Sequence, residues 1–84
     1  MTKQREAEQR QTAANLLEGL LEGSISASEA IQRWPVVPGD ELIERIRCLL
    51  YHYRDDEDVR ARDKKYAEWQ CNEFRTLLSE LKGH

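Results

Sequence analysis

An apolar stripe with helical spacing recurs in three separate parts of this chain and constrains the fold more than any other feature. The central stripe consists of Leu42, Ile43, Ile46, Leu49, Leu50 and Tyr53. The first consists of Ala13, Leu16, Leu17, Leu20 and Leu21, and the last of Tyr66, Trp69, Phe74, Leu77, Leu78 and Leu81. Apolar residues at three- and four-residue intervals lie along one face of a helix. No alternating apolar pattern of useful length occurs, so no sheet is predicted.

Local signals predict the ends of the first and last helices. A first helix is expected over about residues 3–22, with Gly23 as its stop. Its opening turns are polar on every side, so residues 1–9 are expected to fray. The last helix is expected to begin after Asp63, which is well placed to cap it, and to end before Gly83.

Capping signals also place the helices between these two. Ser26 and Glu29 have the spacing of a capping box, which predicts a short helix over residues 27–33. That helix ends before Trp34, because the proline that follows disfavours helical geometry at this tryptophan. We expect Trp34 in the core. Asp40 is placed to cap the helix that carries the central stripe.

Helices with one apolar face bury that face against each other. The pattern predicts an all-α fold, a compact antiparallel bundle of three long helices and one short helix. A turn and a short helical piece are expected around residues 57–61. The length of 84 residues fits a single helical domain over residues 1–84.

Composition excludes several classes of protein. No apolar run approaches the roughly 20 residues that a membrane-spanning helix needs. The opening sequence MTKQREAEQRQ lacks the apolar segment of a signal peptide, so a cytoplasmic protein is expected. Cys48 and Cys71 are too few for a disulfide scaffold and are expected to be free thiols, which leaves open any redox role.

Charge is unevenly distributed along the chain. Residues 18–58 hold ten acidic and four basic side chains, a net charge of −6 within a chain whose total is −3. An acidic centre repels nucleic acid and attracts basic proteins, so we expect a basic protein partner, with no nucleic acid and no membrane bound. An equally weighted alternative is that the charge only keeps the protein soluble.

Four consecutive carboxylates mark the expected partner-binding surface. Like charges at neighbouring positions cost stability unless water or a cationic partner offsets them. Tyr51 lies off the apolar stripe near this run, where it is either a binding hot spot or an ordinary surface tyrosine. The candidate partner-binding residues are Glu41, Glu44, Tyr51, Asp55, Asp56, Glu57 and Asp58.

No catalytic, cofactor or metal site is predicted. Cys48 and His52 share a helix face, but mid-helix Cys48 lacks an assured positive environment to form a thiolate. A calcium loop beginning at Asp55 is excluded, because Val59 and Arg60 stand where it needs an oxygen ligand and a glycine. The four glycines are scattered singly, so there is no phosphate-binding loop. The aromatic residues Tyr66, Trp69 and Phe74 are expected in the core.

The segment LLEGSISASEAIQRW, followed by an apolar helix and then HYRDDEDVRARD, resembles small helical bacterial toxin-immunity proteins of the colicin-like or contact-dependent-inhibition type. The resemblance covers about residues 20–63. It implies a helical bundle without catalysis that binds one toxin domain tightly, often a nuclease with a basic cleft. The run over residues 55–58 would then match the family's acidic segment and either stand in for nucleic-acid phosphates or cap an exosite of the toxin. The chain departs from the pattern in following this run at once with Arg60, Arg62, Lys64 and Lys65.

The expected function is that of an immunity protein, which neutralises a cognate toxin domain through an acidic surface, and the expected toxin domain is a nuclease. The alternative is a non-catalytic regulatory or assembly subunit that binds another cytosolic protein. Both a monomer and a homodimer are compatible with the sequence. A neighbouring gene for a secreted toxin would favour the first function, and dimerisation without a toxin partner would favour the second.

Overall fold

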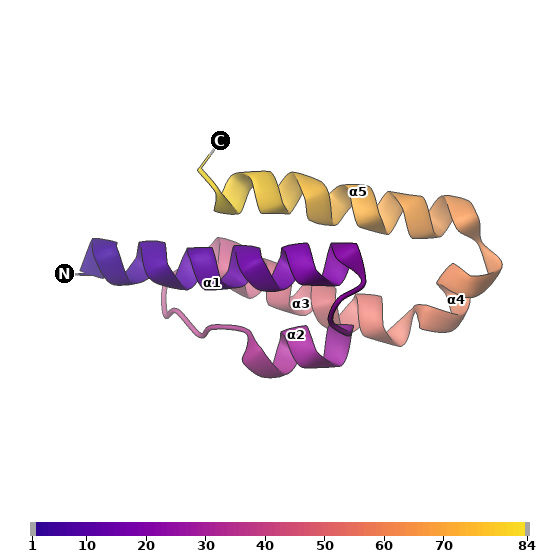
Figure 1. The fold of residues 1–84 in the computed structure, drawn as a ribbon, viewed down its shortest axis with the longest axis horizontal. Coiled ribbons are helices and arrows are strands. Elements are labelled where there is room, and N and C mark those ends of the chain that lie inside the picture. The colour runs from indigo at the N-terminus through magenta and orange to yellow at the C-terminus, as the bar shows by residue number, and fades with distance from the viewer. Residues whose placement is uncertain (1, 84) are drawn as a thin grey trace.

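The computed structural model describes the backbone of residues 2–83 and the side chains of residues 7–83. Within that range the chain forms helices and no strand, which confirms the all-α class. The helices are α1 (Thr2–Glu22), α2 (Ala27–Arg33), α3 (Glu41–Asp55), α4 (Glu57–Arg62) and α5 (Lys64–Leu81) (Figure 1). Three are long and two are short, so the helical piece expected around residues 57–61 is a helix in its own right. The fraying expected for residues 1–9 stays a prediction, and Met1 lies outside the described residues.

The long helices lie along one common direction, and the molecule measures 46 × 25 × 22 Å. Figure 1 shows α1 and α3 running the same way, while α2 and α5 run back against them. Helix α5 packs along α1, and α2 packs against α3. Helix α4 forms the corner where the chain turns from α3 into α5, at the end of the molecule opposite the start of α1.

Side-chain caps begin three of the helices, as the sequence predicts. The Ser26 hydroxyl accepts a hydrogen bond from the N–H of Glu29, and the Asp63 carboxylate accepts one from the N–H of Tyr66. The Asp40 carboxylate accepts from two backbone N–H groups in the first turn of α3. These bonds satisfy donors that have no partner within the helix.

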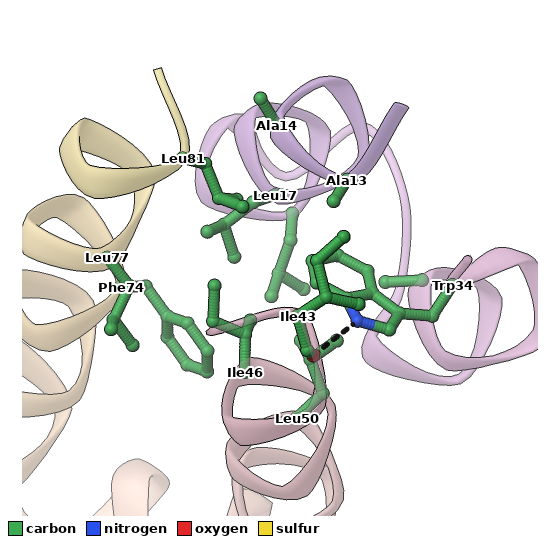
Figure 2. Close-up of a cluster of buried hydrophobic side chains, with 12 residues drawn as sticks. Ala13, Ala14, Leu17, Trp34, Ile43, Ile46, Leu50, Phe74, Leu77 and Leu81 are labelled. Atoms are coloured by element: carbon green, nitrogen blue, oxygen red, sulfur yellow. Dashed lines mark hydrogen bonds between the residues drawn. The ribbon is translucent and has the colours of Figure 1, made fainter. Parts of the chain in front are cut away.

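The core lies where α1, α2, α3 and α5 meet (Figure 2). Its buried apolar residues are Ala13, Ala14, Leu17, Leu20, Ala30, Trp34, Ile43, Ile46, Leu50, Phe74, Leu77 and Leu81. Trp34 is only 5% exposed, and its indole N–H donates to the carbonyl of Ile43 at 2.9 Å, which confirms its expected place in the core. This bond lets a polar ring atom be buried without an unsatisfied donor.

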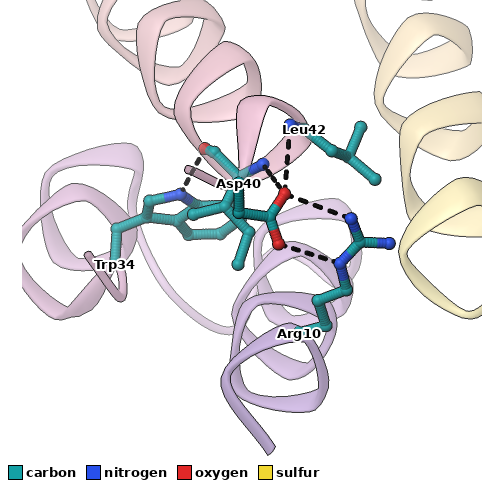
Figure 3. Close-up of polar contacts among 5 residues, drawn as sticks. Arg10, Trp34, Asp40 and Leu42 are labelled. Carbon is teal, nitrogen blue, oxygen red and sulfur yellow. Dashed lines mark hydrogen bonds and ion pairs between the residues drawn. The ribbon is translucent and has the colours of Figure 1, made fainter. Parts of the chain in front are cut away.

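An ion pair joins α1 to the start of α3 (Figure 3). The Arg10 guanidinium donates to both carboxylate oxygens of Asp40, at 2.9 and 3.1 Å, and the Asp40 side chain is only 7% exposed. The hydrogen bonds from Arg10 hold the pKa of the Asp40 carboxyl below its usual value, and those from Leu42 and Ile43 add to the effect against the opposing influence of burial. Asp40 therefore caps α3 and also ties two helices together.

The expected burial of Trp69 is wrong, because this side chain is 55% exposed. The buried face of α5 is defined instead by Gln70, Phe74, Leu77 and Leu81. Trp69 precedes Gln70 by one residue and is therefore rotated by about 100° from that face. Phe74 is buried as expected, whereas Tyr66 is only half-buried.

Candidate functional site

The four consecutive carboxylates lie at the corner between α3 and α4, and we call this region the acidic corner (residues 55–58). Asp55 ends α3, Asp56 separates the two helices, and Glu57 and Asp58 begin α4. Carboxylates at the first turn of α4 lie near the positive end of that helix, which partly offsets their mutual repulsion. The side chains of the acidic corner nevertheless have different surroundings.

Asp55 and Asp58 carry exposed ion pairs with arginines of their own helices. The Asp55 carboxylate lies 3.3 Å from Arg54, and the Asp58 carboxylate lies 3.5 Å from Arg62. Their side chains are 66% and 74% exposed, and exposed pairs of this kind are worth about 0–1 kcal/mol. Glu57 is exposed and forms no ion pair within residues 7–83. These carboxylates can exchange their weak internal contacts for contacts with a partner at little cost.

Asp56 differs from its neighbours because its side chain points to α5. It accepts hydrogen bonds from the Tyr66 hydroxyl at 2.7 Å and from the Gln70 amide at 3.3 Å, and it makes no side-chain cap for α4. The hydrogen bond to the Asp56 carboxylate raises the pKa of the Tyr66 phenol, because a phenolate could not donate it and would be repelled. Asp56 thus joins the acidic corner to the last helix, a role the sequence analysis missed.

Arg60 turns inward and extends this polar contact. Its guanidinium lies 3.5 Å from the ring centre of Tyr53, and it donates to the carbonyl of Tyr53 and to the Gln70 side-chain oxygen. Gln70 is therefore buried with both ends of its amide bonded. We call this set the corner network, which consists of Tyr53, Asp56, Arg60, Tyr66 and Gln70. Of the basic residues that follow the acidic run, Arg62 forms an ion pair with Asp58, and Arg60 belongs to the corner network.

The remaining candidate residues lie on the outer face of α3 among arginines. Tyr51 is 38% exposed, and the guanidinium carbons of Arg47 and Arg54 lie 6.0 and 5.1 Å from its ring centre. Glu44 is paired with Arg47, and this hydrogen bond lowers the pKa of the Glu44 carboxyl. Glu41 is exposed at the start of the helix. The expected acidic surface is thus a mixed-charge face on α3 that leads to the acidic corner.

The sulfur and imidazole groups do not gather into a cluster. Cys48 is exposed and Cys71 is half-buried, and they are not bonded to each other. His52 is exposed one turn beyond Cys48. Among the described residues, no group of three or more histidine, cysteine or acidic side chains is placed to hold a metal ion.

A groove of about 250 Å³ lies between α3 and α5, beside the acidic corner. Its lining residues are Leu49, His52, Asp56, Tyr66, Trp69, Gln70, Glu73 and Phe74. The rings of Tyr66 and Trp69 are stacked, with 5.8 Å between centres and 25° between planes. Sequence reasoning missed this groove because it assigned Trp69 to the core.

Comparisons with protein-family models, curated proteins and solved structures find no match for this chain. Within the described part of the chain, no helix combines the length and apolar character needed to cross a bilayer.

Proposed function

We propose that this chain is a non-catalytic binding protein that recognises a basic protein partner through the acidic corner. The observation that carries the proposal is the exposure of Asp55, Glu57 and Asp58 at one corner of the molecule, away from the apolar core. The ion pairs of Asp55 and Asp58 are weak and solvent-exposed, and Asp58 also accepts a hydrogen bond from the N–H of Val59. The acidic corner therefore offers negative charge at low cost.

The finer proposal is that the partner is a bacterial toxin domain and that binding neutralises it. This step rests on the resemblance of residues 20–63 to toxin-immunity proteins. A nuclease cleft is lined with positive charge, and carboxylates can occupy it in place of phosphates. Opposite charge would also raise the association rate by steering the encounter. The protein would then act in the cytoplasm of the cell that it protects.

A second function, that of a regulatory or assembly subunit, is favoured by an exposed aromatic side chain. Trp69 is 55% exposed, and aromatic residues are enriched at the core of protein interfaces. Such a subunit would bind another cytosolic protein or a second copy of this chain. Sedimentation at increasing concentration distinguishes the two proposals, because self-association without a toxin partner supports the subunit.

Affinity capture with matched baits tests the acidic corner. The baits are the parent, the double variant Asp55→Asn with Asp58→Asn, and a control with Glu8→Gln and Glu80→Gln. The control makes the same charge change at exposed residues near the start of α1 and the end of α5, two helix ends that lie away from the acidic corner (Figure 1). We expect the parent and the control to retain the same basic protein, released by salt, and the double variant to retain roughly tenfold less of it. Equal retention by all three baits would refute the proposal, and co-production with a captured toxin tests neutralisation directly.

A further inference from the structure

We infer that the groove between α3 and α5 is a second binding site, which takes an arginine side chain of the basic partner, with Trp69 as the anchoring ring. The inference extends the proposed function, since it rests on the partner being a basic protein. Apart from Asp56, which the two regions share, the groove is lined by residues outside the acidic corner.

Trp69 has the surroundings of a binding anchor. Its indole is 55% exposed, and Tyr66 stacks against it at 5.8 Å, so the two rings form a broad aromatic surface on α5. Tryptophan and tyrosine are enriched among the residues that dominate the energy of protein interfaces. The groove also holds apolar side chains, Leu49 and Phe74, which would exclude water from a bound group.

The charge of the groove favours a cation. Its lining includes the carboxylates of Asp56 and Glu73 and contains no lysine or arginine. The Asp56 carboxylate accepts hydrogen bonds from Tyr66 and Gln70 within the corner network. Glu73 is exposed and forms no ion pair among residues 7–83, so its carboxylate is open to a donor from outside. An anion would be repelled by both groups.

The other tyrosine rings near this end of the molecule indicate which cation fits. Arg60 lies over Tyr53 at 3.5 Å, and Arg54 lies near Tyr51 at 5.1 Å. Within the described part of the chain, no such arginine covers Trp69. A planar guanidinium can stack on an indole and still donate to a carboxylate at its edge, whereas a lysine ammonium is a compact, strongly hydrated charge. An arginine supplied by the partner would therefore stack on Trp69 as arginines of this chain lie over its tyrosine rings.

Nuclear magnetic resonance of the two indole N–H groups tests this site. Trp34 is buried and bonded, and Trp69 is exposed, so the two signals report on the core and the groove separately. The Trp69→Phe variant assigns them. The probes are blocked tetrapeptides with two central arginines, two lysines or two citrullines between glycines. We expect the arginine peptide to shift the Trp69 signal saturably and leave the Trp34 signal in place, the lysine peptide to bind more weakly, and the uncharged citrulline peptide to bind at least about tenfold more weakly.

Matched variants on α5 complete the test. Glu73→Gln should weaken binding of the arginine peptide at least about threefold. Glu80→Gln, an exposed acid of the same helix outside the groove, should leave binding unchanged. A Trp69 signal that does not move, equal binding of the citrulline peptide, or equal effects of the two variants would overturn the inference. Shifts confined to the amides of Asp55, Glu57 and Asp58 would overturn the groove site and leave the acidic corner standing. A shift of the Trp69 signal, together with equal capture by all three baits, would support the groove site and refute the acidic corner.

Discussion

The two ends of α3 each use an aspartate to join this helix to a neighbour, but with different results. At the start, Asp40 is almost buried, accepts two hydrogen bonds from Arg10 and caps the helix beside the buried Trp34. At the end, Asp56 is half-buried and is bonded to the side chains of Tyr66 and Gln70.

Under the proposed function, the start of α3 serves the stability of the fold and the outside of the corner serves partner binding. Around Asp40 the polar groups bond to each other at the edge of the apolar core. Around Asp56 the corner network holds α4 and α5 in position while carboxylates and an exposed tryptophan remain on the outside. Changes near the start of α3 should therefore affect the free energy of unfolding, and changes on the outside of the corner should affect partner binding.

The largest effect on stability is expected from Leu50→Ala. Leu50 is 0% exposed in the core, and its truncation should cost about 2–5 kcal/mol of unfolding free energy by leaving a cavity. Leu49→Ala is the matched control, because Leu49 is half-buried at the groove and can be partly replaced by water. Urea denaturation measures both changes, and an equal loss in the two variants would contradict the assignment of the core.

The next largest effect is expected from Asp40→Ala. Loss of a helix cap costs about 0.5–2 kcal/mol of unfolding free energy. The substitution also removes the carboxylate that accepts two hydrogen bonds from the Arg10 guanidinium, which adds to the loss. Asp63→Ala removes an exposed cap that accepts one backbone hydrogen bond and should cost less. Thermal melts compare the two variants, and a greater loss for Asp63→Ala would remove the special role given to Asp40.

The lowered pKa of Asp40 also predicts how stability depends on pH. Because the folded state favours the charged carboxylate, this group stabilises the fold above its ordinary pKa of 3.8, and that contribution is lost as the pH falls through the lower folded value. The parent should therefore lose more unfolding free energy than Asp40→Asn when the pH is lowered below about 3.8. If the unfolding free energies of the parent and of Asp40→Asn fall in parallel as the pH is lowered, Asp40 does not stabilise the fold through its charge.

A smaller effect is expected from Tyr66→Phe, which removes the hydroxyl that Asp56 accepts from. The raised pKa of Tyr66 means that its stabilising contribution is complete below pH 10 and is lost as the pH rises through the higher folded value. The difference in melting temperature between the parent and Tyr66→Phe should therefore shrink in strong alkali. A difference that stays constant there would show that the hydroxyl does not stabilise the corner.

The sequence predicted features that depend on neighbouring residues and missed those that depend on distant ones. The caps at Ser26, Asp40 and Asp63 are visible because the donor lies within three residues of the acceptor. The exposure of Trp69 depends on which face of α5 meets the other helices. The apolar stripe of α5 includes Trp69, so the sequence alone does not show that this residue lies outside the buried face.

The sequence named the candidate residues but did not reveal their surroundings. Four successive carboxylates look equivalent in the sequence, yet Asp56 differs because Tyr66 and Gln70 come from another helix. The groove could not be foreseen for the same reason, since its two walls are separate helices. The outward position of Tyr51 was foreseen from the helical period, whereas its two arginine neighbours were not.

The smallest effect on stability and the most direct test of the account both come from Asp55→Asn with Asp58→Asn. We expect the unfolding free energy of this double variant to change by no more than about 0.5 kcal/mol, since both side chains are exposed. Stopped-flow association with the captured partner, measured over a range of salt concentrations, should show a slower rate and a shallower salt dependence than in the parent. An unchanged association rate together with a lowered melting temperature would contradict the account, because the acidic corner would then serve stability rather than binding.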